Sequence, residues 1–171
     1  METLKPFEPL FSIHLIGDLK ILDDENLEVT FTWKDMQNQL LFPIEQSLGR
    51  QHELWKQTCF EIFLRPKIGI GYFEINLSTT GAWNIYKFES YRNPQPPEEY
   101  PLGEVLSIQS EKEKIVARFK IENADLSLIE YSLCAVLVLK NGKITYWSTH
   151  HSQHKPDFHH PDNLTLERKH I

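Results

Sequence analysis

Apolar and polar residues alternate strictly over residues 27–33, which read Leu-Glu-Val-Thr-Phe-Thr-Trp. A period of two places every apolar side chain on one face of an extended chain, so the segment predicts a half-buried β-strand. Residues 114–121 show the same pattern, with Arg118 and Lys120 on the polar face. An amphipathic helix longer than about three turns is not visible anywhere in the sequence. The alternation therefore predicts an all-β fold.

Further strands are predicted by short runs rich in aromatic and β-branched residues. These runs cover residues 11–16, 59–64, 72–77, 83–88, 133–140, 144–148 and 164–166. Asn141-Gly142 predicts a type I′ turn between the two late strands. Residues 125–130 can form one helical turn, whereas residues 93–103 and 150–161 are predicted to be loops. We expect an antiparallel β-sandwich of about ten strands, with under about a tenth of its residues in helix.

The chain is long enough for one domain with a full core, and no repeat or shift in composition divides it. We therefore expect one domain over residues 1–171. A net charge of −6 without a basic cluster argues against nucleic-acid binding. Neither a leader-like start nor an apolar run of membrane-spanning length is present, so we expect a cytoplasmic protein without membrane association. Cys59 and Cys134 lie in apolar segments and are expected to be buried, unpaired thiols.

Polar side chains gather on two of the middle strands. In residues 72–77, alternation places Phe73, Ile75 and Leu77 on the core face, and Tyr72, Glu74 and Asn76 on the other. On the preceding strand, Glu61 is the single charged residue in an apolar run, and a carboxylate there must face solvent or find a partner. A solvated outer face would account for these residues. The functional alternative is a polar groove across the sheet.

Large aromatic residues flank this face, namely Trp55, Trp83, Tyr86 and Trp147. Sugars are recognised by this combination because their C–H faces pack on aromatic rings while polar side chains bind the hydroxyl groups. Core packing is the competing interpretation for each tryptophan. The residues therefore favour a carbohydrate or a sugar-like small molecule as the ligand, with no cofactor required.

Residues 149–162, which we call the His-rich loop, contain five of the eight histidines. A metal site would require His151, His154, Asp157 and His159 to converge on one ion. The simpler interpretation is a proline-stiffened loop that Asp157 and His159 tie to the sheet by hydrogen bonds, and that covers the groove from residue 151 to residue 159. The spacing matches neither an H-E-x-x-H helix nor a zinc ribbon.

Motifs of nucleophilic or phosphate chemistry, such as G-x-S-x-G and G-x-x-x-x-G-K-S/T, are absent from the sequence. Two alternatives to plain binding remain open. Glu61 and Glu74, on neighbouring strands, can form the acid pair of a glycoside-acting enzyme, or act with the His-rich loop around a metal. Haem can also bind through His151 or His159.

Three motifs resemble the bacterial DOMON-like proteins, a family related to the family 9 carbohydrate-binding modules. The motifs are residues 54–64 (LWKQTCFEIFL), 72–83 (YFEINLSTTGAW) and 155–162 (KPDFHHPD). The resemblance extends over about residues 11–166 and implies a β-sandwich whose relatives bind sugars or, in other DOMON branches, haem. It matches Glu61 and Asn76 to the acidic and amide positions of the motif, and it places Trp55 and Trp147 near the stacking tryptophans of the sugar-binding modules.

The chain departs from the family pattern at His154, which stands where the family has a glycine, and at His150. A metal or haem role for these two histidines therefore gains no support from the resemblance. We predict a non-catalytic, ligand-binding domain without a metal, and the sequence does not show whether it has a protein partner. The predicted ligand-binding residues are Trp55, Glu61, Tyr72, Glu74, Asn76, Trp83, Trp147, His151, Lys155, Asp157 and His159.

Overall fold

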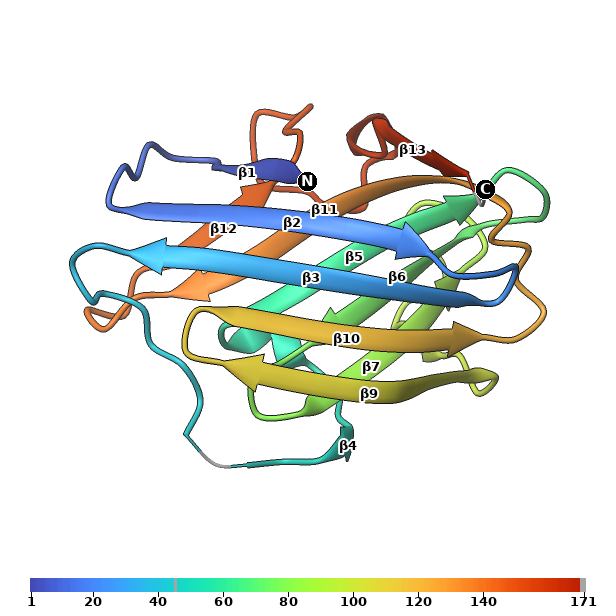
Figure 1. Ribbon diagram of the computed structural model, residues 1–171. Coiled ribbons are helices and arrows are strands. Elements are labelled where there is room, and N and C mark those ends of the chain that lie inside the picture. The colour runs from blue at the N-terminus through green and yellow to red at the C-terminus, as the bar shows by residue number, and fades with distance from the viewer. Residues whose placement is uncertain (45, 170–171) are drawn as a thin grey trace.

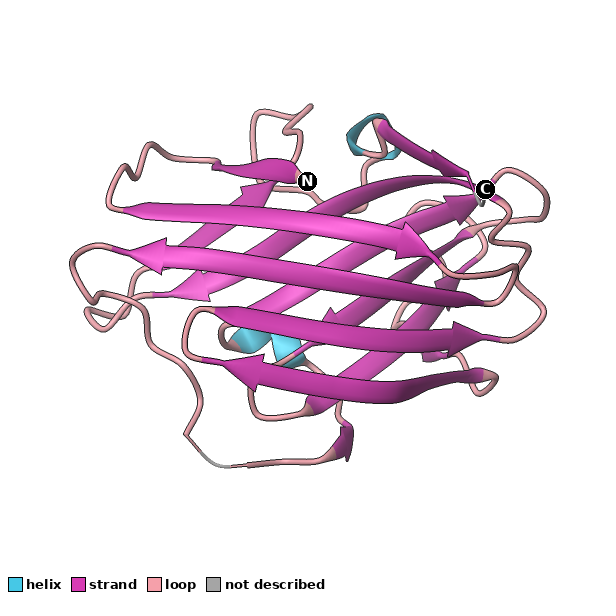
Figure 2. Ribbon diagram, viewed as in Figure 1, coloured by secondary structure: helices cyan, strands magenta, loops and turns pink. Residues whose placement is uncertain are grey.

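The computed structural model describes residues 1–44 and 46–169 and consists almost entirely of strands and loops (Figure 2). Its strands are β1 (Glu2–Pro6), β2 (Ile13–Ile21), β3 (Asn26–Asp35), β4 (Gly49–Arg50), β5 (Cys59–Pro66), β6 (Tyr72–Leu77), β7 (Ala82–Phe88), β8 (Glu98–Glu99), β9 (Gly103–Glu111), β10 (Lys114–Ile121), β11 (Leu128–Val138), β12 (Ile144–Ser148) and β13 (Leu166–Lys169). Among these described residues, helix is limited to two 3₁₀ turns, η1 (Leu54–Lys56) and η2 (Pro161–Asn163). The prediction of an all-β fold with almost no helix is confirmed.

The strands form one curled sheet in the order β4-β7-β6-β5-β11-β12-β1-β2-β3-β10-β9, with β13 beside β11 and β8 beside β7. The sheet is mixed because β4 and β7 pair in parallel, whereas the neighbouring pair β6 and β7 is antiparallel. Figure 1 shows β2, β3, β10 and β9 as a front layer, with β12, β11, β5, β6 and β7 as a rear layer. β1 connects the two layers because it pairs with β12 on one side and β2 on the other.

The main apolar core lies between these layers. Phe31 and Trp33 of β3 meet Phe60 of β5, with ring centroids 4.9 and 5.1 Å apart. Both β3 residues belong to the alternating run that predicted a half-buried strand, and both are buried. Full burial of each such side chain contributes about 1.5–3 kcal/mol. The alternation read from the sequence thus sets the side of β3 that faces the rear layer.

Several strand boundaries differ from those predicted. β2 begins at residue 13 and continues to residue 21, and β13 follows rather than includes residues 164–165. The helical turn expected at residues 125–130 is absent, because β11 already begins at Leu128 and pairs with both β5 and β13 there. Hydrogen bonds to two neighbouring strands outweigh a weak local helix preference. The short strands β1, β4 and β8 and the longer β9 were not predicted, which brings the number of strands in the described residues to thirteen.

The hairpin between β11 and β12 forms, but without the predicted type I′ turn. Gly142 has a φ of 85°, whereas Asn141 is not in the left-handed region. The Gly142 N–H donates to the Leu139 carbonyl at 2.8 Å, and the Leu139 N–H donates to the Lys143 carbonyl at 2.8 Å. This is a loop of the kind that ends on a left-handed glycine, so only one residue needs a positive φ.

Both cysteines are buried and unpaired, as predicted. Within residues 1–44 and 46–169, none of the helical segments has the length and apolar character needed to cross a membrane.

Candidate functional site

The side chains of β6 divide between two faces as the alternation predicts. Phe73, Ile75 and Leu77 belong to the core between the layers. Tyr72 points the other way and joins a second apolar cluster on the outer face of the rear layer, which also contains Phe63 and Phe88. Glu74 and Asn76 share this outer side with Tyr72 and are buried, with exposed fractions of 4% and 0%. The predicted polar face exists, but loops cover it.

A pocket of about 360 Å³ lies on this outer face, and we call it the outer pocket. Its volume is near the lower end of the about 300–1,000 Å³ that is typical of small-molecule sites. Strands β5, β6, β7, β11 and β12 contribute Glu61, Phe63, Glu74, Phe88, Val136 and Tyr146. Turn η1 and two loops contribute Trp55, Arg92, Gln95, Pro97, Pro156, Asp157, Phe158 and His159. Five of these side chains are aromatic rings of Phe, Tyr or Trp, so the pocket combines apolar surfaces with two glutamates.

Glu61 faces the outer pocket because its neighbours Phe60 and Ile62 face the core. Only 3% of its surface is exposed, and its Oε1 atom has no hydrogen-bond partner among the described residues. Burial, and after it the nearby Glu74 carboxylate, raises the pKa of Glu61 well above its ordinary value. Leaving a buried polar atom unsatisfied costs about 1–3 kcal/mol. Oε1 is therefore the atom of the pocket that most requires a ligand.

Glu74 is better supplied with partners than Glu61. Its Oε1 atom accepts a hydrogen bond from Asn76 Nδ2 at 2.8 Å, and its Oε2 atom lies 3.5 Å from His159 Nε2. Burial raises the pKa of Glu74 to about 7, against the lowering effects of the Asn76 hydrogen bond and the Arg92 charge. Its carboxyl group consequently changes charge near neutral pH.

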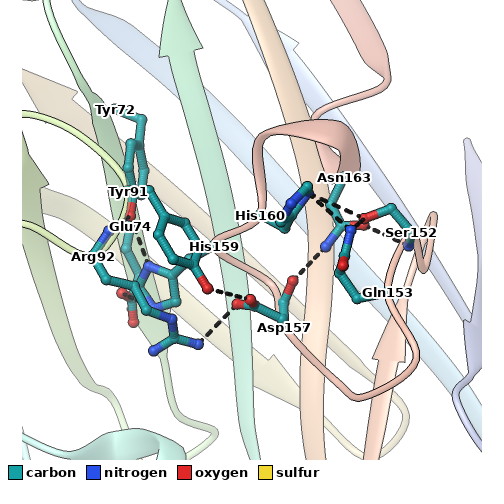
Figure 3. Close-up of polar contacts among 10 residues, drawn as sticks. All are labelled: Tyr72, Glu74, Tyr91, Arg92, Ser152, Gln153, Asp157, His159, His160 and Asn163. Carbon is teal, nitrogen blue, oxygen red and sulfur yellow. Dashed lines mark hydrogen bonds and ion pairs between the residues drawn. The ribbon is translucent and has the colours of Figure 1, made fainter.

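Both ring nitrogens of His159 face protein partners. The Tyr72 hydroxyl accepts a hydrogen bond from the Arg92 backbone N–H at 3.2 Å and forms a hydrogen bond with His159 Nδ1 at 2.8 Å (Figure 3). Nε2 lies on the other side of the ring, 3.5 Å from Glu74 Oε2. Burial, followed by the Arg92 charge, lowers the pKa of His159 to about 4, so the ring is neutral at physiological pH.

The His-rich loop is fixed by hydrogen bonds on both sides of Asp157. Figure 3 shows Tyr91 and Arg92 pointing at its carboxylate, to which they donate at 2.5 and 2.8 Å. Asn163 Nδ2 donates to the Asp157 carbonyl, and Asn163 Oδ1 accepts from the Ser152 N–H at 2.9 Å. The prediction that hydrogen bonds hold this loop is confirmed. His159 ties the loop directly to the sheet through its hydrogen bond with Tyr72 of β6. Asp157 instead accepts hydrogen bonds from the turn after β7.

The four proposed metal ligands do not converge. His151 Nε2 lies 2.9 Å from the Lys5 carbonyl, and its ring packs edge-on against Phe7 at 5.3 Å, outside the outer pocket. His154 is exposed, whereas Asp157 and His159 line the pocket. In the part of the chain that the structure describes, no group of three or more His, Cys, Asp and Glu residues is arranged to hold a metal ion.

The fold has a counterpart among solved structures. A protein of Bacteroides uniformis ATCC 8492, whose crystal structure is described as that of a "putative carbohydrate-binding protein", matches this chain with a TM-score of 0.57. The match covers 95% of this chain and 84% of that chain, at 10% sequence identity. At this level of sequence identity, the match shows a similar fold and nothing further about this chain. No family model and no curated protein sequence matches the chain.

The structure brings together five of the predicted site residues at the outer pocket, which are Trp55, Glu61, Glu74, Asp157 and His159. Tyr72 and Asn76 do not line it, but they contact His159 and Glu74 through the hydrogen bonds described above.

Four predicted placements are corrected, the first being His151, which lies against Lys5 and Phe7 rather than over the outer pocket. Trp147 belongs to the main core with 1% of its surface exposed, and its Nε1–H donates to Thr145 Oγ1 at 2.9 Å. Trp83 packs against the same core, and the Arg50 guanidinium lies 4.5 Å from the centre of its ring. Lys155 is exposed and does not line the outer pocket. The tryptophans face inward because the alternation of β7 and β12 directs them between the layers.

Sequence reasoning missed Arg92, Tyr146 and Phe158, all of which line the outer pocket. Tyr146 must point to the face of β12 opposite Trp147, so its side follows only once Trp147 is assigned to the core. Phe158 lies inside the His-rich loop, where no periodicity indicates direction. Arg92 follows β7 with a φ of 51° in a turn that the sequence does not define.

Proposed function

We propose that the protein binds a carbohydrate or a sugar-like small molecule in the outer pocket, without catalysing a reaction and without a cofactor. The observation that carries this proposal is the buried Oε1 atom of Glu61, which has no protein partner within the described residues and lies in a pocket lined by aromatic rings. A sugar hydroxyl can donate to this atom while the apolar face of the sugar ring packs on Trp55 or Tyr146.

Two further observations support the proposal. The carbohydrate-binding role in the description of the Bacteroides uniformis protein agrees with it. The motifs in residues 54–64, 72–83 and 155–162 resemble those of DOMON-like proteins and family 9 carbohydrate-binding modules. We propose that the chain is related to these proteins. We also propose that residues 1–171 form one sandwich domain, of which residues 45, 170 and 171 lie outside the described part. Finally, we propose that the protein is cytoplasmic and binds neither nucleic acid nor membranes.

The paired glutamates favour one alternative, hydrolysis of a glycosidic bond. Glu61 and Glu74 lie in the same pocket with pKa values that are both raised, and Glu74 titrates near neutral pH. One protonated and one ionised carboxyl group are what a glycosidase requires. Haem binding has no comparable support, because His151 lies outside the pocket and both nitrogens of His159 face protein partners.

A ligand screen tests the proposal. Neutral, acidic and amino sugars are added to the protein, and thermal shift is followed by isothermal titration calorimetry. A ligand at 100 times its Kd stabilises the fold by about 2.7 kcal/mol. We expect at least one class of sugar to bind, and Glu61→Gln and Trp55→Ala to weaken that binding. Glu111→Gln, on the exposed end of β9, serves as the control.

Absence of binding by every sugar refutes the proposal. Turnover of chromogenic glycosides that is abolished by Glu61→Gln would instead show that the protein is a glycoside-hydrolysing enzyme.

A further inference from the structure

The charges that line the outer pocket do not balance. The acidic side chains are Glu61, Glu74 and Asp157, and the basic one is Arg92. The Arg92 guanidinium donates to Asp157 at 2.8 Å, so its charge already has a partner. Within the described residues, no lysine or arginine forms an ion pair with Glu61 or Glu74, and the imidazole of His159 is neutral. The two glutamates therefore share a buried site in which no described lysine or arginine contacts them, and the Arg92 charge acts on Glu74 only from a distance.

The surroundings of this pair are apolar or weakly polar on each side. Glu61 has Cys59 on its own strand and Cys134 on β11 as titratable neighbours, and burial raises the pKa of both thiols. Glu74 has Tyr72 on its own strand, Tyr86 opposite it on β7, and His159 of the His-rich loop as neighbours, and the charge of Arg92 acts on it from the turn after β7. Two negative charges in such a site are unstable, and either protons or an external cation must offset them.

A protonated amine fits this arrangement better than a hydroxyl group. An ammonium group presents three donors, enough for Glu61 Oε1 and for the carboxylate of Glu74 together. Its charge is further stabilised by the faces of aromatic rings, which the outer pocket supplies from Trp55, Tyr146 and Phe158. A hydroxyl group donates only one hydrogen bond and carries no charge, so it can satisfy Glu61 Oε1 but cannot offset a negative charge on the pair.

We infer that the ligand of the outer pocket carries a protonated amine, which Glu61 and Glu74 bind together against the aromatic rings. This inference rests on the proposed function, and within it the ligand is an amino sugar with a free amine. Binding of the cation displaces a proton from the glutamate pair, because a carboxyl group beside an ammonium ion is more stable in its ionised form. Release of protons on binding is therefore a second property of an amine ligand that a neutral sugar lacks.

Two matched pairs of ligands test the inference, glucosamine with glucose and cyclohexylamine with cyclohexanol. Dissociation constants are measured by isothermal titration calorimetry at about pH 6, below the pKa of the Glu74 carboxyl group, in two buffers of different ionisation enthalpy. We expect the amine of each pair to bind at least about tenfold more tightly than its neutral partner, the scale of a hydrogen bond between charged groups. The buffer dependence of the enthalpy should show release of protons for the amines alone.

Variants assign the effect to the glutamate pair. Glu61→Gln keeps the shape of the side chain and should reduce the amine preference by about tenfold, while Glu111→Gln leaves the preference unchanged. Glu74→Gln provides a second variant if Glu61→Gln does not fold, as checked by circular dichroism. An unchanged preference in both folded glutamine variants overturns the inference.

The ligand pairs separate this inference from the proposed function. Glucose that binds as tightly as glucosamine overturns the amine and leaves carbohydrate binding intact. Cyclohexylamine that binds while every sugar of the screen fails to bind supports the amine and overturns carbohydrate binding. Absence of binding by all four ligands overturns the amine inference, whereas carbohydrate binding is overturned only when every sugar of the screen described above also fails to bind.

Discussion

Replacing Glu74 by glutamine should change how the stability of the protein depends on pH. In the folded protein the pKa of Glu74 is about 7, against 4.5 for an ordinary glutamate. Between these two values the folded state holds a proton that the unfolded state has lost, so the free energy of unfolding falls as pH rises. Each pKa unit corresponds to about 1.4 kcal/mol, which gives a loss of roughly 3 kcal/mol by pH 7 and no further loss above it.

His159 opposes this effect in the unmodified protein, whereas Glu61, whose pKa is also raised, adds a slope of the same sign as Glu74. The pKa of His159 is lowered from 6.5 to about 4, so the unfolded state binds the extra proton between these values and stability rises with pH. The slopes of Glu74 and His159 oppose each other over most of one pH range. The informative quantity is therefore the difference between Glu74→Gln and the unmodified protein, in which the contributions of His159 and Glu61 cancel to first order.

We expect the free energy of unfolding of Glu74→Gln, minus that of the unmodified protein, to increase by roughly 3 kcal/mol from about pH 4.5 to about pH 8. Glutamine can still accept the hydrogen bond from Asn76 Nδ2, so the variant removes the ionisation and keeps the contact. Urea denaturation with linear extrapolation at a series of pH values measures the difference. Glu111→Gln should give a flat difference because that glutamate is exposed. A flat curve for Glu74→Gln would refute the argument that burial raises this pKa.

Three other predictions concern side chains described above. His159→Gln should give the opposite curve, with its difference from the unmodified protein decreasing by roughly 3 kcal/mol between about pH 4 and pH 6.5 in the same urea experiment. Trp147→Ala should lower the free energy of unfolding by about 3–5 kcal/mol, since it removes a core side chain, whereas Trp55→Ala should mainly weaken binding, by on the order of 1 kcal/mol in calorimetry. Cys59 and Cys134 should resist iodoacetamide in the folded protein and react only after unfolding, as measured by mass spectrometry, because burial raises the pKa of both thiols.

Strand alternation predicted the parts of the fold that depend on local geometry. The two faces of β6 follow from the period of two alone, so Phe73 and Glu74 were assigned to opposite sides correctly. β9 escaped prediction because its pairing with β10 changes register between Arg118 and Phe119. Val105 and Ile108 consequently both pack toward the core although they are three residues apart, which breaks the period that the sequence would otherwise show.

Only some residues of the outer pocket could be predicted from the sequence. Glu61 was conspicuous in the sequence because a charge inside an apolar strand needs a partner. The side on which Trp147 points could not be read from residues 144–148, because Tyr146 and Trp147 are adjacent and either can face the core. Arg92 is positioned by its ion pair with Asp157, which lies 65 residues further along the chain. Contacts of that kind leave no local pattern.

β1 connects the front and rear layers of the curled sheet, and this has a consequence for truncation of the chain. Removal of residues 2–6 would leave β2 and β12 without the strand that lies between them. Two rows of unpaired backbone N–H and C=O groups would then be exposed side by side, and such strand edges recruit other chains. An N-terminally shortened protein should thus self-associate, with oligomers joined edge to edge through β2 and β12, rather than simply melt at a lower temperature.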